Sequence, residues 1–178
     1  MAADDAVSAR PPAGRGAAGD DAGGPSVLDR AFVHWRERDR TAFIPYLTLG
    51  YPSLEATPRL LRGLADAGAD VIELGVPFSD PLADGPTIQR ASWAALEQGA
   101  SLEAALELLA ELAEELPPVV LFSYLNPILR MGVERFVERA AAAGAAGLLV
   151  TDLPVGTDLE LERRLAGAGP DLIRLVAP

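Results

Sequence analysis

The sequence predicts an α/β fold built around a parallel β-sheet. Apolar stretches of strand length alternate along the chain with helical patterns, and the connections between them are short. The strands are almost continuously apolar, which is typical of a sheet covered by helices on both faces. Two architectures remain open at this stage: a doubly wound sheet of five strands, or the first five-eighths of a (β/α)8 barrel.

The predicted elements begin at Ser26. This residue is a suitable cap for a helix that runs to about Arg38, with Leu28, Phe32 and Trp35 on one face. The predicted strands, rich in Val, Ile and Leu, cover residues 43–49, 71–78, 119–125, 147–153 and 172–177. The predicted helices cover residues 55–67, 86–98, 101–115, 128–143 and 157–168. Glycines, which commonly end helices, follow three of them: Gly68, Gly144 and Gly169.

The loop after the first strand favours the barrel. A doubly wound nucleotide-binding sheet is expected to carry a G-x-G-x-x-G loop there, whereas residues 49–52 read Leu-Gly-Tyr-Pro. Barrel enzymes draw single polar residues from the ends of several strands. This chain has such residues in or just after its predicted strands: Thr48, Glu73, Asp80, Asp84, Tyr124, Asn126 and Asp152.

The domain organisation is expected to be simple. Residues 26–178 are predicted to form one partial (β/α) barrel domain, and residues 1–25 a disordered N-terminal extension. The extension has almost no large apolar side chain, so burial cannot offset the entropy of ordering it. It lacks the apolar segment of a signal peptide and is more acidic than a transit peptide. The chain has no run of about 18 apolar residues, so no transmembrane helix is expected.

The charged residues exclude several classes of function. All 15 basic residues are Arg and the net charge is −11, which argues against a nucleic acid or an anionic membrane as partner. The absence of Lys excludes a Schiff-base aldolase, a PLP-bound enzyme and a Walker A loop. The single histidine, His34, is interpreted as a packing or surface residue. The absence of Cys is compatible with a reducing cytoplasm, the location we expect.

Glu73 is the first candidate for chemistry. It lies inside an apolar strand, where strand alternation places it on the same side as Val71 and Gly75. The small Gly75 leaves room beside the carboxylate. Burial there would raise the pKa of Glu73 toward neutrality and make it a usable general acid or base. The structural alternative is a buried Glu paired with a Ser or Tyr hydroxyl.

The other candidates each have a structural alternative. Asp80 and Asp84 lie in a Pro- and Gly-containing loop, where Asp also caps turns and helices, and a calcium loop would need more oxygen ligands than they supply. Asp152 is either a site residue or, slightly favoured, the start of a turn. Three aromatic residues near strand ends either line a planar pocket or fill the core: Tyr46, Phe122 and Tyr124.

A specific family resemblance appears at residues 73–85, which read Glu-Leu-Gly-Val-Pro-Phe-Ser-Asp-Pro-Leu-Ala-Asp-Gly. This segment, continued by Pro-Thr-Ile-Gln at 86–89, resembles the motif of the tryptophan synthase α chain. Residues 43–52, residues 123–127 with Gly132 and Phe136, and residues 149–154 resemble the family's first, third and fourth units. The resemblance runs in order over residues 27–178.

The resemblance implies a (β/α)8 barrel that cleaves indole-3-glycerol phosphate to indole and glyceraldehyde 3-phosphate, without a cofactor or metal of its own. Glu73 matches the family's acid/base carboxylate, and Asp84 matches the carboxylate that accepts the indole N–H. The indole-pocket positions are Tyr46, Phe122, Tyr124, Thr151 and Leu175. The positions that contact a β subunit are Pro77, Asp80 and Asn126. That β subunit would hold PLP in an α2β2 assembly.

The resemblance also departs from the family pattern. Strands six to eight are expected to be missing, and with them the phosphate site, the closing loop and the hydroxyl partner from strand six. We therefore expect little activity from these 178 residues alone, and unpaired edges at the first and fifth strands. The rival interpretation is a non-catalytic half barrel that docks a β-like subunit. A different phosphate-handling barrel enzyme is disfavoured by the Asp-Pro-Leu-Ala-Asp-Gly loop.

Overall fold

The computed structural model describes residues 24–167 and 169–176, and residues 1–23 of the predicted extension lie outside this range. Its strands are β1 (Tyr46–Thr48), β2 (Ile72–Gly75), β3 (Val119–Ser123), β4 (Gly147–Val150) and β5 (Asp171–Ile173). Its helices are α1 (Val27–Glu37), α2 (Thr57–Asp66), α3 (Pro86–Glu97), α4 (Leu102–Leu112), α5 (Leu125–Met131), α6 (Val133–Ala142) and α7 (Leu159–Ala166).

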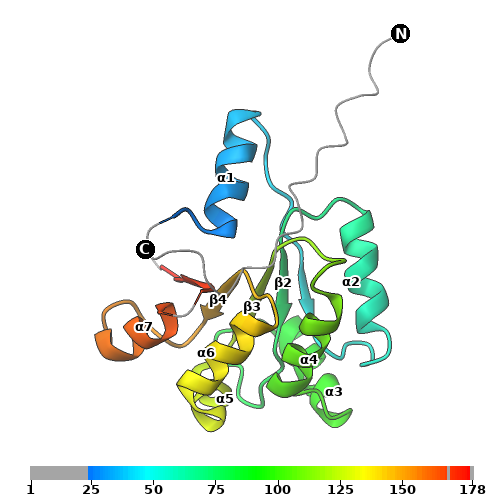
Figure 1. Cartoon of the computed structure of the whole chain (residues 1–178). Helices are drawn as coiled ribbons and strands as arrows, with labels where there is room; N and C mark the ends of the chain where they lie inside the picture. Colours follow the sequence, from blue (N-terminus) through cyan, green and yellow to red (C-terminus); the bar gives the residue numbers. More distant parts are fainter. Residues whose placement is uncertain (1–23, 168, 177–178) are drawn as a thin grey trace.

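The sheet has the topology of a barrel segment. Its strands lie in chain order, β1-β2-β3-β4-β5, and every neighbouring pair is parallel. A doubly wound sheet would reverse its order at a switch point, and this sheet does not. The prediction of a partial barrel with five parallel strands and an N-terminal helix is confirmed (Figure 1).

Several predicted boundaries are wrong, for local reasons. The predicted helix 128–143 is two helices, because Gly132 with φ 92° interrupts it between α5 and α6. The first helix of this pair starts at Leu125, inside the predicted strand 119–125. The strands are shorter than predicted, partly because Pro45 and Pro77 have no N–H to give to a ladder. The predicted ends at 168 and 177 lie outside the described residues.

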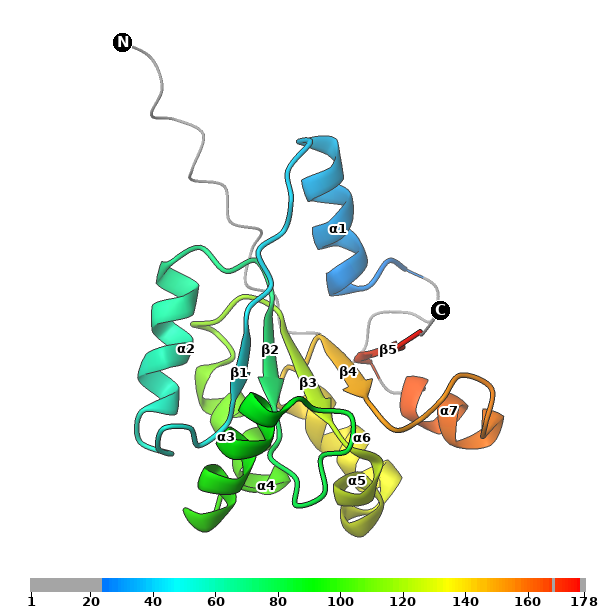
Figure 2. The ribbon, with the colours of Figure 1, turned by 180° about the vertical axis from the view of Figure 1, so that it is seen from behind.

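Strand alternation separates two apolar layers. One side of the sheet packs Ile72, Leu74 and Leu148 against the surrounding helices. The other side packs residues from the starts of the strands, including Val71, against α1. Figure 2 shows the strand arrows pointing away from α1. We therefore call the side of Val71 the inner face, and α1 covers it at the N-terminal ends of the strands.

The start of α1 is set by its sequence. Ser26 accepts the Asp29 N–H at 3.0 Å, and the Asp29 carboxylate accepts the Ser26 N–H at 3.1 Å. This reciprocal capping box confirms Ser26 as the predicted cap. Within residues 24–167 and 169–176, no helix is both long and apolar enough to cross a membrane.

The segments at the carboxyl ends of the strands are held by hydrogen bonds from side chains that lie in other parts of the fold. Gln98, at the end of α3, donates to the Pro52 carbonyl at 3.0 Å in the loop after β1. Asp152, after β4, accepts the Leu125 N–H at 2.7 Å in the segment after β3.

The loop after β4 has a similar fastening. The buried Glu162 accepts the Gly156 N–H at 2.7 Å and pairs with Arg174, which follows β5, at 2.8 Å. The Arg174 guanidinium holds the pKa of Glu162 below its usual range. These contacts make each loop depend on a neighbouring part of the fold.

An ion pair between the exposed Arg40 and the buried Asp70 stabilises the opposite end of the sheet. Asp70, only 5% exposed, accepts two hydrogen bonds from the Arg40 guanidinium at 2.9 and 3.0 Å. The same carboxylate accepts the Phe43 N–H at 2.8 Å, and the Asp70 N–H donates to the Phe43 carbonyl at 2.9 Å. The segment between α1 and β1 is thereby tied to the start of β2.

We predict that Asp70→Asn lowers the free energy of unfolding by roughly 1–3 kcal/mol, because it removes the charge that pairs with Arg40 and weakens buried hydrogen bonds. Urea unfolding of the 178-residue chain measures the change. Asp66→Asn, at the exposed end of α2, is the matched control and should have little effect. Equal losses in the two variants would contradict the assigned role of Asp70.

Candidate active site

The candidate site lies on the inner face toward the carboxyl ends of β1 to β4. Glu73 stands in the middle of β2, in register with Tyr46 on β1 and Val120 on β3. It alternates with Ile72 and Leu74, which pack on the opposite side, so its side chain belongs to the inner face. The predicted inward position of Glu73 agrees with this arrangement.

The environment of Glu73 favours a neutral carboxyl group. Burial raises the pKa of Glu73. No hydrogen bond to its carboxylate is found among the residues that the structure describes. The hydroxyl partner that would make it a purely structural buried acid is therefore not found there. A partly buried carboxyl group without a fixed partner remains available to exchange a proton.

The Tyr46 side chain lies over Gly75 of β2. A Cβ atom added at Gly75 would overlap the Tyr46 hydroxyl and lie 2.8 Å from Tyr46 Cε2. The ring therefore occupies the place that a side chain at 75 would need. Burial raises the pKa of Tyr46, a hydrogen bond with Thr48 opposes the rise, and the charges of Asp84 and Glu73 add to it. The Tyr46 hydroxyl thus lies within electrostatic reach of both predicted carboxylates.

Asp84 is held by the loop that connects β2 to α3. Its N–H donates to the Pro81 carbonyl at 3.1 Å, and its own carbonyl accepts from the Gln89 side chain at 2.9 Å. Burial raises the pKa of the Asp84 carboxyl, and a hydrogen bond from Tyr124 partly offsets this rise. Helix α3 has no side-chain cap, so the Asp84 carboxylate is not the helix cap that was its predicted alternative.

Tyr124 connects the loop to the sheet. It is only 4% exposed, and its hydroxyl accepts the Ala83 N–H at 2.9 Å. Its ring stacks on Phe78, with centroids 4.9 Å apart. The hydrogen bond between Tyr124 and Ala83 spans 41 residues of the chain, and no sequence pattern predicts it.

The predicted aromatic wall is partly assembled. The Tyr46 and Phe122 rings meet edge to face, with centroids 5.3 Å apart. Phe122 also packs with the apolar cluster of the inner face. Leu175 lies two residues beyond Ile173 of that cluster and is 53% exposed. It is not part of that cluster, so its place in the pocket stays a prediction.

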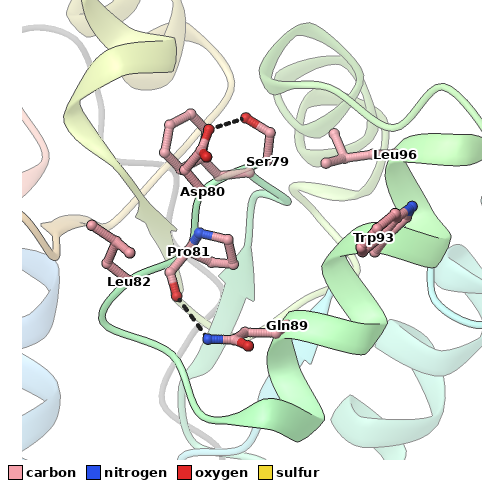
Figure 3. A pocket seen from close by; sticks show the side chains of 8 residues that line it. Ser79, Asp80, Pro81, Leu82, Gln89, Trp93 and Leu96 are labelled. Carbon is pink, nitrogen blue, oxygen red and sulfur yellow. Dashed lines mark hydrogen bonds between the residues drawn. The ribbon is translucent and has the colours of Figure 1, made fainter.

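Asp80 lies outside this cluster. It accepts a hydrogen bond from the Ser79 hydroxyl at 2.7 Å and is exposed. Figure 3 shows it beside an apolar pocket of about 380 Å³ that Trp93 and Leu82 also line. Trp93 is 71% and Leu82 93% exposed. Neither Glu73 nor Asp84 lines this pocket, so the structure separates Asp80 from these two carboxylates.

The remaining predicted residues differ in their exposure and in their contacts. Asn126 is exposed on α5, whereas Pro77 is buried. Asp152 caps the start of α5, 27 residues earlier in the chain, which agrees with a structural role. His34 contacts Arg38 on the surface of α1. Among the described residues, no group of three His, Cys, Asp or Glu side chains could hold a metal ion.

We predict that Gly75→Ala destabilises the chain by about 1–3 kcal/mol, because the added methyl group displaces the Tyr46 ring. Gly63→Ala is the matched control. That position is exposed in α2 with no atom within 4 Å of an added Cβ, so the substitution should stabilise by about 0.5–1 kcal/mol. Urea unfolding measures both. The loss at Gly75 should shrink in a Tyr46→Leu background, and an undiminished loss would contradict the overlap.

Comparison with known proteins gives one family. The model of the family described as tryptophan synthase alpha chain matches residues 32–178. The tryptophan synthase alpha chain of Carboxydothermus hydrogenoformans is 50% identical over 154 residues, which are 86% of this chain and 58% of that protein. The tryptophan synthase of Saccharomyces cerevisiae is 42% identical over 153 residues, 85% of this chain and 22% of that protein.

Solved structures give the same result. The tryptophan synthase subunit alpha of Legionella pneumophila superposes with a TM-score of 0.80 at 34% identity, over 84% of this chain and 58% of that one. The aminoacrylate-bound tryptophan synthase of M. tuberculosis gives a TM-score of 0.80 at 38% identity, over 85% and 62%. The chain thus spans less than two thirds of the relatives and structures named here. The family model and the sequence identities show that it belongs to the tryptophan synthase alpha chain family.

Proposed function

We propose that this chain acts in a lyase of the tryptophan synthase type, which cleaves indole-3-glycerol phosphate to indole and glyceraldehyde 3-phosphate. One observation carries the proposal: two carboxylates with pKa values raised by burial, Glu73 and Asp84, both lie within electrostatic reach of the Tyr46 hydroxyl. An aromatic pair, Tyr46 and Phe122, adjoins them and offers a flat apolar wall to an indole ring.

The two carboxylates suit different parts of a retro-aldol step. Cleavage breaks the bond between the indole ring carbon and the glycerol chain, adds a proton to that ring carbon and removes one from the adjacent hydroxyl. Glu73, with a raised pKa and no fixed partner, suits the transfer of both protons. Asp84 would accept the indole N–H and stabilise the positive charge that develops on the ring. The balance of charge requires neither a metal nor a Schiff base.

We further propose a β subunit as partner, in an α2β2 assembly and a cytoplasmic location. The partner would hold PLP, for which this sequence has no lysine. Asp80 and Asn126 suit the contact because they are exposed away from the carboxylates. Pro77 is buried, so we propose that it supports the shape of this surface rather than supplying much contact area.

We predict that Glu73→Gln lowers the rate of indole release at least about 100-fold, because it removes the group that transfers protons. The same change should raise stability near pH 8. A carboxyl group with a raised pKa in the folded chain binds its proton more tightly there than in the unfolded chain. Its ionisation therefore costs stability above the folded pKa, and this cost disappears below about pH 4, the range of the unfolded pKa.

The assay follows indole release by the 178-residue chain with a β subunit, and unfolding is measured at pH 4 and pH 8. Asp80→Asn is the matched control, and without the β subunit it should release indole at the same rate as the unaltered chain. Cleavage that survives Glu73→Gln would contradict the proposed role. Stimulation of the β subunit without any cleavage by the unaltered chain would favour the non-catalytic half barrel instead.

We predict that Asp80→Ala and Asn126→Ala each weaken binding to a β subunit by about 5–30-fold, whereas Glu73→Gln leaves the affinity within about twofold. Exposed polar groups at an interface affect association, while a group on the inner face does not touch the partner. Calorimetric titration of the chain with a β subunit measures the affinity. Tight binding by the Asp80→Ala/Asn126→Ala double variant would overturn the proposed surface.

A further inference from the structure

The loop between β2 and α3 contains a tight turn that ends at Asp84. The Asp84 N–H donates to the Pro81 carbonyl at 3.1 Å, which is the hydrogen bond of a β-turn. The two central residues of this turn, Leu82 and Ala83, are exposed, so burial of their side chains does little to hold it. The position of the Asp84 carboxylate therefore depends on the hydrogen bonds that fix the turn.

The Gln89 side chain contacts both ends of this turn. Its amide nitrogen donates to the Asp84 carbonyl at 2.9 Å and to the Pro81 carbonyl at 3.4 Å, the second at the long limit of a hydrogen bond. Figure 3 shows the Gln89 amide turned toward the Pro81 carbonyl. Both neighbours are acceptors, so the nitrogen of the carboxamide, with its two N–H donors, is the atom that faces them.

Helix α3 explains why Gln89 reaches this loop. Gln89 lies near the start of α3, where its own N–H donates to the Gly85 carbonyl at 3.0 Å. Side chains of an α-helix tilt toward its N-terminus, so this one extends back over the residues before the helix. A helix cap must accept hydrogen bonds from the free N–H groups at the helix start, which the donating nitrogen of Gln89 cannot do. The amide therefore holds the loop and does not cap the helix.

The other end of α3 holds a second loop in the same way. The Gln98 amide nitrogen donates to the Pro52 carbonyl at 3.0 Å and to the Gly50 carbonyl at 3.4 Å, both in the loop after β1. Each glutamine thus joins two carbonyls of one loop at the carboxyl ends of the strands. Helix α3 connects the loop after β1 through Gln98 and the loop after β2 through Gln89.

The middle of the turn is held separately, from the sheet. The Ala83 N–H donates to the hydroxyl of Tyr124, which directly follows β3, at 2.9 Å. This bond and the bond from Asp84 to Pro81 do not involve Gln89. Loss of the Gln89 amide therefore loosens the Asp84 end of the turn without detaching the loop from the sheet.

We propose that Gln89 is a positioning residue: its carboxamide, held on α3, fixes the Asp84 carbonyl and thereby the direction in which the Asp84 carboxylate points. The catalytic meaning of this role rests on the proposed function. The direction of the carbonyl is set by the backbone torsions of Asp84, and the side-chain rotamers that a residue can adopt depend on these torsions. The alternative is that Gln89 is a surface residue whose hydrogen bonds do not affect the Asp84 side chain.

The test observes the Asp84 side chain by NMR in the 178-residue chain, which needs no activity. Three-bond couplings from the backbone to the Asp84 carboxyl carbon report the χ1 rotamers, and amide hydrogen exchange reports the stability of the turn. Gln89→Met keeps the length of the side chain and removes both donors. We expect one dominant Asp84 rotamer in the unaltered chain and a mixture in Gln89→Met. Exchange of the Asp84 N–H should become about 3–10-fold faster, the effect of losing one ordinary hydrogen bond.

Gln98→Met is the matched control, because it removes the same group from the same helix and acts on the other loop. It should leave the Asp84 rotamer and the Asp84 N–H exchange unchanged. Gln89→Glu is the second variant. It keeps the shape of the side chain but turns an acceptor toward the two carbonyls in place of a donor, so it should mix the rotamers at least as much as Gln89→Met.

The outcomes separate this proposal from the proposed function. An unchanged Asp84 rotamer in both Gln89 variants, or an equal change in Gln98→Met, would overturn the positioning role. Indole release by the chain with a β subunit should fall about 10-fold in Gln89→Met, because a loosened carboxylate spends less time in its productive orientation. Mixed rotamers in Gln89→Met, together with no indole release by the unaltered chain, would refute the proposed function and leave the positioning of Asp84 by Gln89 intact.

Discussion

The arrangement of the site depends on the close approach of Tyr46 to Gly75. Neighbouring strands of a sheet lie only about 4.8 Å apart, so a large ring on β1 can cross β2 only where the facing residue has no side chain. Gly75 provides that place, two residues beyond Glu73 on the same face. The tyrosine hydroxyl is thereby brought into the field of both carboxylates. One missing Cβ thus brings groups from β1, β2 and the following loop together.

The two ends of the sheet carry different kinds of ionic group. At the N-terminal ends, Asp70 is fully paired with Arg40 and a backbone amide, and α1 seals the apolar inner face. Further along the strands, Glu73 is partly buried without a hydrogen-bond partner among the described residues, and burial raises the pKa of both Glu73 and Asp84. A paired charge stabilises a fold, whereas an unpaired, desolvated one costs stability and is available for chemistry.

The sequence was sufficient where local patterns determine the structure. Ser26 and its capping partner are three residues apart, and the inner position of Glu73 follows from alternation within a single strand. The sequence was insufficient where distant residues meet. Asp152 caps a helix 27 residues earlier, and Tyr124 binds an amide 41 residues earlier. The repeat pattern of a single strand or helix carries no information on such distant pairs. The break between α5 and α6 depends on a positive φ at Gly132, which glycine can adopt but need not adopt.

The contacts that hold the loops at the carboxyl ends of the strands determine the order in which these loops can take their final conformation. Gln98 completes the loop after β1, Tyr124 the loop after β2, and Asp152 the segment after β3. Arg174 completes the set by holding Glu162 against the loop after β4. Gln98, Tyr124 and Asp152 each come later in the chain than the loop that they contact. Glu162 is held by Arg174, which follows it. During synthesis, each loop therefore gains its final conformation only after the following unit has emerged, so the rim of the candidate site forms one unit later than the strands that carry it.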